Sequence, residues 1–127
     1  MAGAIGRTIS RNRGRQAERI ALQYLVDRGL TVSQTNFRCR YGEIDLVMRD
    51  GHCLVFVEVR YRKANRFADA TMSVDERKQR KLQRTANAYL GQNSECADLP
   101  VRFDVIALDR TGGDNATIRW TTDAFRP

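Results

Sequence analysis

Carboxylates occupy strand positions that are usually apolar in two neighbouring stretches, Gly42-Glu43-Ile44-Asp45-Leu46-Val47-Met48 and Val55-Phe56-Val57-Glu58-Val59-Arg60. The residues between them are Arg49-Asp50-Gly51-His52, and an Asp-Gly pair between apolar runs is a strong hairpin signal. The sequence therefore predicts two antiparallel strands joined by a turn centred on Asp50-Gly51.

The position of that turn sets the register of the two strands. With a four-residue loop, Asp45 faces Phe56 and Glu43 faces Glu58. Because successive side chains alternate between the faces of a strand, four charged residues fall on one face of the predicted hairpin. They are Glu43, Asp45, Glu58 and Arg60.

Three acids and one base on an otherwise apolar hairpin are costly unless a cation sits among them. Like charges directly opposite each other destabilise a sheet by up to ~1 kcal/mol per pair, and burial adds to that cost or raises the pKa of the acid. We therefore expect a divalent-metal site with a cationic side chain beside it. The alternative is an edge hairpin whose polar face is simply solvated, since alternating polar residues are normal in half-exposed strands.

Composition limits the class of protein. A chain of 127 residues is long enough for one domain with a core, and 42% hydrophobic residues argue against wholesale disorder. The net charge of +7 favours a polyanionic partner, with nucleic acid ahead of an anionic membrane surface. No apolar stretch is long enough to span a bilayer.

Cysteine and histidine usage excludes several kinds of site. Cys39, Cys53 and Cys96 are odd in number and widely spaced, so they support neither a disulfide framework nor a zinc site. Free thiols are typical of a reducing, cytoplasmic location. The single histidine, His52, falls in the predicted turn, which argues against catalysis of the Ser-His-Asp type.

The chain begins with a segment, residues 1–13, that we expect to be a flexible basic arm preceding a single domain over residues 14–127. A helix is predicted from about Arg15 to Arg28, ending at Gly29 as a C-terminal cap. Glu18 lies at the border of its buried stripe. It could face a site on the sheet, although an acid in a first helical turn that stabilises the helix dipole is the simpler explanation.

A second helix is predicted from a capping-box pattern, Ser73-x-x-Glu76, to Gly91, after a polar loop at 63–72. One side of this helix is basic over two turns. Repulsion between like charges at helical spacing favours a surface that faces phosphates over a merely solvated one. The nucleic-acid-binding residues expected there are Arg77, Lys78, Arg80, Lys81 and Arg84.

Further strands are predicted at Leu30–Asn36, Arg102–Asp109 and Ala116–Trp120, the last two separated by a turn at Gly112-Gly113-Asp114-Asn115. The element order is then α-β-β-β-α-β-β. Helices before and within a set of strands indicate an α/β domain with a mixed central sheet flanked by helices.

The residues also resemble known families. Asp45, followed thirteen residues later by Glu58-x-Arg60, resembles the Asp…(Asp/Glu)-x-Lys signature of restriction-endonuclease-like nucleases. Together with Ala17-Glu18-Arg19, Gly42–Leu46 and Arg102–Val105, the pattern resembles the YraN family of uncharacterised bacterial proteins over roughly residues 14 to 125. It is also similar to archaeal Holliday-junction resolvases, in which a helical Glu joins the two strand acids.

This resemblance implies a restriction-endonuclease-like core and roles for individual residues. Asp45 and Glu58 would bind Mg²⁺ or Mn²⁺, with the main-chain carbonyl of Val59 as a further ligand. Glu18 would complete the site directly or through a water molecule. Glu43 matches the family motif and would support the ligands without being one of them.

Arg60 stands where the signature has Lys, and this departure matters for the chemistry. A lysine can lose its proton when its pKa is lowered, whereas an arginine stays charged. Arg60 would therefore hold a phosphate or stabilise developing charge, and general-base catalysis by residue 60 is not expected.

The function that the resemblance implies is metal-dependent hydrolysis of DNA phosphodiesters, with DNA favoured over RNA. No segment resembles a base-reading motif, so we expect selection of branched or repair DNA by structure, and paired cuts would need a homodimer. One alternative is a nucleic-acid-binding accessory protein that keeps the fold with little or no cleavage activity. Another is an interaction module whose basic face binds an acidic protein.

Overall fold

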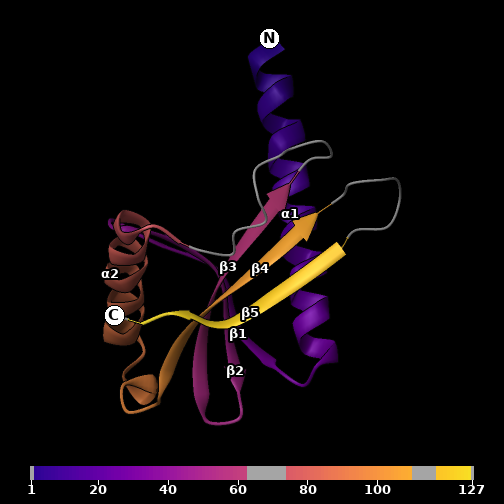
Figure 1. Ribbon diagram of the computed structural model, residues 1–127. Helices are drawn as coiled ribbons and strands as arrows, with labels where there is room; N and C mark the ends of the chain where they lie inside the picture. Colours follow the sequence, from indigo (N-terminus) through magenta and orange to yellow (C-terminus); the bar gives the residue numbers. More distant parts are fainter. Residues whose placement is uncertain (1, 63–73, 110–116, 127) are drawn as a thin grey trace.

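The chain forms a five-stranded sheet with one helix on each face, seen in a computed structural model (Figure 1). The structure describes residues 2–62, 74–109 and 117–126, and among these the side chains of 2–13 and 62 are left out. The elements run α1 (Ala2–Asp27), β1 (Thr31–Cys39), β2 (Gly42–Asp50), β3 (Cys53–Arg62), α2 (Glu76–Gln92), η1 (Ser94–Cys96), β4 (Val101–Asp109) and β5 (Thr117–Phe125). The predicted fold class and element order are confirmed.

The strands lie in the sheet in sequence order, from β1 to β5. All neighbouring pairs are antiparallel except β3 with β4, which are parallel and are joined through α2. A parallel pair needs a long crossover, and a helix is the usual one, so the second helix makes the sheet mixed. The final strand was predicted to end at Trp120, but β5 continues to Phe125.

Helix α1 ends as the sequence predicts. Gly29 has a φ of 97°, and its N–H donates to the Val26 carbonyl while the Leu30 N–H donates to the Leu25 carbonyl. This pair of bonds is the Schellman motif, which satisfies the last carbonyls of a helix. Leu25 and Leu30 are both buried in one apolar cluster, so the chain turns back against the sheet at this point.

The start of α1 differs from the prediction. The helix begins at Ala2 instead of near Arg15, so the backbone of the expected arm is helical. The side chains of residues 1–13 lie outside the described part of the chain, and the flexibility of this segment remains a prediction. The prediction missed this start because the first residues carry no local signal for the beginning of a helix. Figure 1 shows that the first turns of α1 project beyond the sheet.

The predicted register of the hairpin is wrong by two residues. Asp50 pairs with Cys53 and Leu46 with Val57, so the loop contains only two residues. Gly51 opens it with a φ of 60°, a conformation that two-residue hairpin loops require and glycine adopts at low cost. Because the error is an even number, each side chain between Leu46 and Asp50 keeps its predicted face.

The start of α2 also differs. Its N-cap is Asp75, whose side chain accepts a hydrogen bond from the Lys78 N–H at 2.8 Å. The predicted capping box is therefore wrong, because Glu76 is the first helical residue and not the third. Ser73, the loop at 63–72 and the predicted turn at 112–115 lie outside the described residues.

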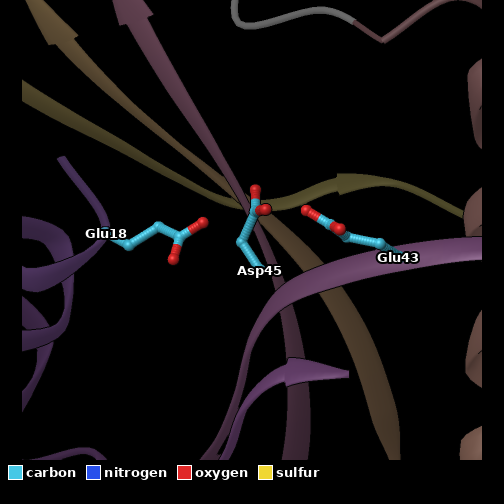
Figure 2. A group of neighbouring side chains, drawn as sticks. All are labelled: Glu18, Glu43 and Asp45. Carbon is cyan, nitrogen blue, oxygen red and sulfur yellow. The ribbon is translucent and has the colours of Figure 1, made fainter. Parts of the chain in front are cut away.

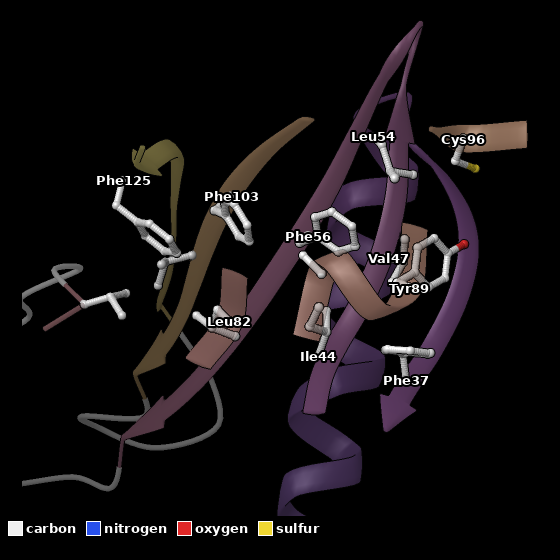
Figure 3. Close-up of a cluster of buried hydrophobic side chains, with 13 residues drawn as sticks. Phe37, Ile44, Val47, Leu54, Phe56, Leu82, Tyr89, Cys96, Phe103 and Phe125 are labelled. Carbon is white, nitrogen blue, oxygen red and sulfur yellow. The ribbon is translucent and has the colours of Figure 1, made fainter. Parts of the chain in front are cut away.

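The core has two parts, one on each face of the sheet. The part beneath α2 is aromatic, and Phe56 and Phe37 both meet Tyr89 edge to face there (Figure 3). The part beneath α1 is aliphatic and includes Leu25, Leu46 and Met48. Among the described residues, no helix is long and apolar enough to cross a membrane.

Candidate functional site

Strand β2 changes the direction of its side chains near Asp45. Leu46 packs on the α1 side of the sheet, but Ile44 packs beneath α2. In a regular strand these two residues, two positions apart, would share a face. The break lies opposite Asn36 of β1, which has a φ of 52° between the pairs that flank it. The regular alternation assumed in the hairpin prediction therefore does not hold between Ile44 and Leu46.

This break brings three carboxylates together. Ligand oxygens of Glu18, Glu43 and Asp45 all lie within 4.8 Å of one another. Glu18 reaches in from α1, and the other two come from β2 on either side of the break (Figure 2). We call these three residues the acid cluster. Glu18 and Asp45 are partly buried, and Glu43 is exposed and forms a 2.9 Å ion pair with Arg38.

Strand β3 meets the acid cluster where its pairing with β2 ends. The last paired residues are Leu46 and Val57, and beyond them the Val59 N–H donates to Asp45 Oδ2 at 2.8 Å. A side chain thus replaces the main-chain acceptor that a continuing ladder would supply. The space between the strands belongs to a hollow of about 590 Å³ that is lined by Glu43, Asp45 and Glu58 among others.

Glu58 approaches this hollow from β3 and lies beside a cation. Its Oε1 is 3.5 Å from Nζ of Lys78 on α2, in an ion pair that is mostly shielded on the glutamate side. Lys78, predicted to bind nucleic acid, therefore contacts an acid of the site. Among the neighbouring charges, Glu58 raises the pKa of Asp45 most, ahead of Glu18 and Glu43.

The protonation of Asp45 reflects this crowding. Burial, followed by the charge of Glu58, raises the pKa of Asp45 to about 7 from an ordinary value of 3.8. The hydrogen bond from Val59 opposes the shift, while Glu18 and Glu43 add to it. Strongly shifted acids in a hollow often mark functional sites, because structural acids are normally matched by donors.

The residues expected at the site are therefore arranged differently from the prediction. Glu43, expected only to support the ligands, is a full member of the acid cluster. Glu58, expected as a ligand, faces Lys78 but still lines the same hollow. Val59 contributes its N–H, and a role for its carbonyl remains a prediction. Arg60 is partly buried two residues after Glu58 on β3.

The acid cluster fits a hard divalent cation in its chemistry. All of its potential ligand atoms are carboxylate oxygens, which Mg²⁺ and Mn²⁺ prefer over nitrogen or sulfur. A cation held by Glu18, Glu43 and Asp45 would also neutralise the charges that raise the pKa of Asp45. The donor set therefore agrees with the type of metal expected from the sequence.

The basic side of α2 lies next to this hollow. The four stripe residues predicted from helical spacing are exposed, and they line a second hollow of about 330 Å³. Its other wall is the β1–β2 turn, through Arg40 and Tyr41. Sequence reasoning missed these two residues, because no pattern within the turn shows that it lies against α2. The stripe residues are Arg77, Arg80, Lys81 and Arg84.

Comparison with known proteins gives a consistent family but no activity. A family model described as "Uncharacterised protein family UPF0102" matches residues 17–108. A UPF0102 protein of Nitrosococcus oceani is 47% identical over 117 residues, covering 91% of this chain and 93% of that protein. A UPF0102 protein of Pseudomonas savastanoi is 48% identical over 112 residues, covering 88% and 91%. The matched region includes the acid cluster, Glu58 and α2.

Proposed function

The chain belongs to the uncharacterised protein family UPF0102, and from the site that it carries we propose that it is a metal-dependent DNA endonuclease. The proposed reaction is hydrolysis of a phosphodiester in branched or otherwise non-duplex DNA. The observation that carries the proposal is the meeting of Glu18, Glu43 and Asp45 within 4.8 Å beside Glu58.

Two features make a structural explanation of the acids less attractive. The acids come from α1, β2 and β3, and they are gathered where the strand alternation breaks. Burial, followed by repulsion from the other acids, raises the pKa of Asp45, so the arrangement costs stability at neutral pH in the absence of a cation. A fold that keeps such a cost is best explained by a use for the cluster.

Some residues of the chain would bind the metal ion, and others would position the metal-binding carboxylates. Glu18, Glu43 and Asp45 would hold Mg²⁺ or Mn²⁺, which would supply Lewis acidity to the scissile phosphate and lower the pKa of a bound water. The Val59 N–H fixes the Asp45 carboxylate by donating to one of its oxygens. Lys78 holds Glu58 at the edge of the hollow.

Arg60 is proposed to stabilise charge on the phosphate. An arginine keeps its proton, and its planar fork can donate two hydrogen bonds to one phosphate. It would not remove a proton from the attacking water. The proton acceptor among the residues of the chain would then be a carboxylate, and Glu43, Asp45 and Glu58 line the hollow at the strand ends.

The basic stripe of α2 would position the DNA backbone. Its residues Arg77, Arg80, Lys81 and Arg84 are exposed. Lys81 also lines the hollow that contains Glu43 and Asp45, so the stripe reaches that hollow. Such contacts with phosphates fix orientation without reading sequence. Selection of the substrate would therefore rest on DNA structure.

Cleavage of a substrate panel tests the proposal. Single-stranded, flapped, four-way and duplex DNA are incubated with Mg²⁺, Mn²⁺ or EDTA, with protein in excess. We expect metal-dependent cleavage by the wild type and its loss, by at least about 100-fold, in Asp45→Asn. Asp98→Asn, at an exposed loop acid, is the matched control and should cleave like the wild type.

Failure to cut any substrate would favour the accessory-protein alternative. The observation behind that alternative is Arg60 in the place of the signature Lys. An accessory protein would bind DNA in EDTA as well as in Mg²⁺. Absence of DNA binding under both conditions would leave a module that binds an acidic protein.

Paired cleavage would require two chains, because the described residues form one acid cluster. A homodimer is proposed for that mode of cutting, with two-fold symmetry. Sedimentation of the protein alone and on a four-way junction tests it. A monomer at all concentrations would restrict the proposed enzyme to single-strand nicks.

A further inference from the structure

The two hollows beside α2 adjoin each other, and together we call them the groove. The hollow at the strand ends includes Asp45 and Glu58, and the hollow along the helix includes the basic stripe. Both are lined by Arg40, Tyr41 and Lys81, so these residues mark the junction between them. A polymer lying along α2 would therefore pass this junction before it reached the acid cluster.

A glycine allows the β1–β2 turn to lie close to α2. Gly42 has a φ of 153°, and a Cβ at this position would lie 3.1 Å from Lys81 Cε and 3.1 Å from Thr85 Oγ1. Contacts this short force a neighbour to move, so the close approach of turn and helix depends on a residue without a side chain. The position of Tyr41 relative to the basic stripe is thus set by the fold.

Tyr41 is the aromatic residue that lines this groove. Tyr41 is 41% exposed, although burial of a large aromatic side chain contributes strongly to stability. The Arg40 guanidinium lies 5.1 Å from the centre of its ring. An exposed ring in a groove that is also lined by cations is the arrangement that proteins use to bind single-stranded nucleic acid, with bases on the ring and phosphates on the cations.

We infer that Tyr41 is a stacking platform for an unpaired base, and that the groove holds a single-stranded segment of DNA leading to the acid cluster. The inference rests on the proposed function for what happens at the cluster, and it adds the class of substrate. A duplex does not offer the face of an internal base, whereas a flap or a splayed junction does. Arg77, Arg80 and Arg84 then contact the phosphates of the stacked strand.

The experiment measures binding and does not need cleavage. Fluorescence anisotropy follows a labelled oligothymidylate and a duplex of equal length in EDTA, at several salt concentrations. Tyr41→Ala should weaken binding of the single strand about tenfold and binding of the duplex by less than about twofold. Tyr41→Phe, which keeps the ring, should bind like the wild type.

Two further variants separate stacking from charge and from general effects. Tyr61→Ala removes a ring that is 36% exposed on β3 and lines neither hollow, so it should bind both ligands normally. Arg80→Ala should reduce the slope of log K against log salt by about 0.7 on the single strand. Tyr41→Ala should leave that slope unchanged, because stacking releases no counterions.

The outcomes distinguish this inference from the proposed function. Equal losses on single strand and duplex in Tyr41→Ala, or no loss, would overturn the inference even if the wild type cleaves DNA. Loss in Tyr41→Phe as large as in Tyr41→Ala would also overturn it, because the hydroxyl and not the ring would then be responsible. Selective loss in Tyr41→Ala would support it even if no substrate is cut, in which case the proposed nuclease activity alone would fail.

Discussion

Two aspartates of the central sheet have different kinds of neighbours. Asp104 of β4 is 1% exposed and accepts hydrogen bonds from Arg102 Nε at 3.0 Å, Trp120 Nε1 at 2.9 Å and the Asp123 N–H at 2.9 Å. Asp45 of β2 accepts one from the Val59 N–H and otherwise faces other acids. Both lie in the sheet, and apolar residues stand on either side of each of them in its strand.

The difference shows what distinguishes a structural acid from a functional one. Burial costs a carboxylate its hydration in both places, but around Asp104 three donors replace it. Around Asp45 the neighbours add repulsion instead. Asp104 therefore fixes the packing of β4 against β5, whereas the Asp45 carboxylate is the one that we propose binds a metal ion.

The largest expected effect is on the structural member of the pair. Asp104→Ala removes the acceptor of Arg102 Nε and Trp120 Nε1, two partly buried donors. We expect a loss of ~3–5 kcal/mol in the free energy of unfolding, as for the breaking of other buried charged networks. Urea denaturation measures it, with the emission of Trp120, the one tryptophan of the chain, as the signal. A loss below ~1 kcal/mol would mean that the network is dispensable.

The second effect is the dependence of stability on pH. Whereas Asp104→Ala should lower the free energy of unfolding, Asp45→Asn should raise it. The pKa of Asp45 is raised from 3.8 to about 7, so between these values the folded protein holds a proton that the unfolded chain has released. Without metal, stability should fall as pH rises from about 4 to about 7. Asp45→Asn does not titrate and should therefore gain on the wild type by as much as ~4 kcal/mol across that range.

Urea denaturation in EDTA at several pH values gives this difference directly. Using the difference between the two proteins cancels the titration of all other groups. Parallel stability curves for wild type and Asp45→Asn would contradict the predicted crowding of the acid cluster. Asp98→Asn, at an exposed acid, should give a curve parallel to the wild type.

The third effect is stabilisation by metal. A cation that binds only the folded state adds RT ln(1 + [L]/Kd), which is ~2.7 kcal/mol at a hundredfold excess over Kd. We expect Mg²⁺ or Mn²⁺ to raise the melting temperature of the wild type and to leave that of Asp45→Asn unchanged. Asp104 has no role in this, so the stabilisation should persist in a mild variant of its network such as Asp50→Asn.

A wild type whose melting temperature ignores both metals at tens of millimolar would speak against a preformed metal site. Repeating the melt with a short single-stranded DNA would then test whether the phosphate completes the site. Metal stabilisation that appears only with DNA would agree with the preference of Mg²⁺ for shared protein and phosphate ligands.

The smallest effect tests Lys78, the α2 cation that forms an ion pair with Glu58. Lys78→Ala removes the partner of Glu58, and this pair is half exposed on the lysine side. We expect a loss of stability of no more than ~1 kcal/mol in EDTA, because solvent screens such a pair. Removal of a competing positive charge should tighten metal binding, which calorimetry can measure. Weaker metal binding would show that Lys78 holds Glu58 in a position that the metal needs.

Local patterns predicted much of the fold. Three predicted features depend on residues only a few positions apart in the sequence. They are the apolar runs around Asp45 and Glu58, the end of α1 at Gly29 and the basic stripe of α2. The physical cause of each acts within one helix or strand. The register of the hairpin was missed because both Asp50-Gly51 and Gly51-His52 are acceptable turn centres. The two differ in which residue takes the positive φ, and the structure gives it to Gly51.

The candidate site was predicted in its residue types but not in its arrangement. Glu18, Asp45 and Glu58 were named from spacing and family resemblance, and all three lie around the strand ends. The place of Glu43 was missed because it depends on a break in alternation, which the left-handed Asn36 in a different strand helps to form. The Asp104 network was missed as well, since its donors come from β4 and β5 together.

The sequence by itself determined which residues could be buried, which helix would be basic, and that several acids would lie near the end of a hairpin. Only the tertiary structure decided which acids share one cluster and which groups stand beside them. Periodicity reports the direction of a side chain relative to its own element, because it follows from local backbone geometry. The neighbours of Asp45 and Tyr41 come from elements that are distant in sequence, and their positions depend on how α1, α2 and the strands pack.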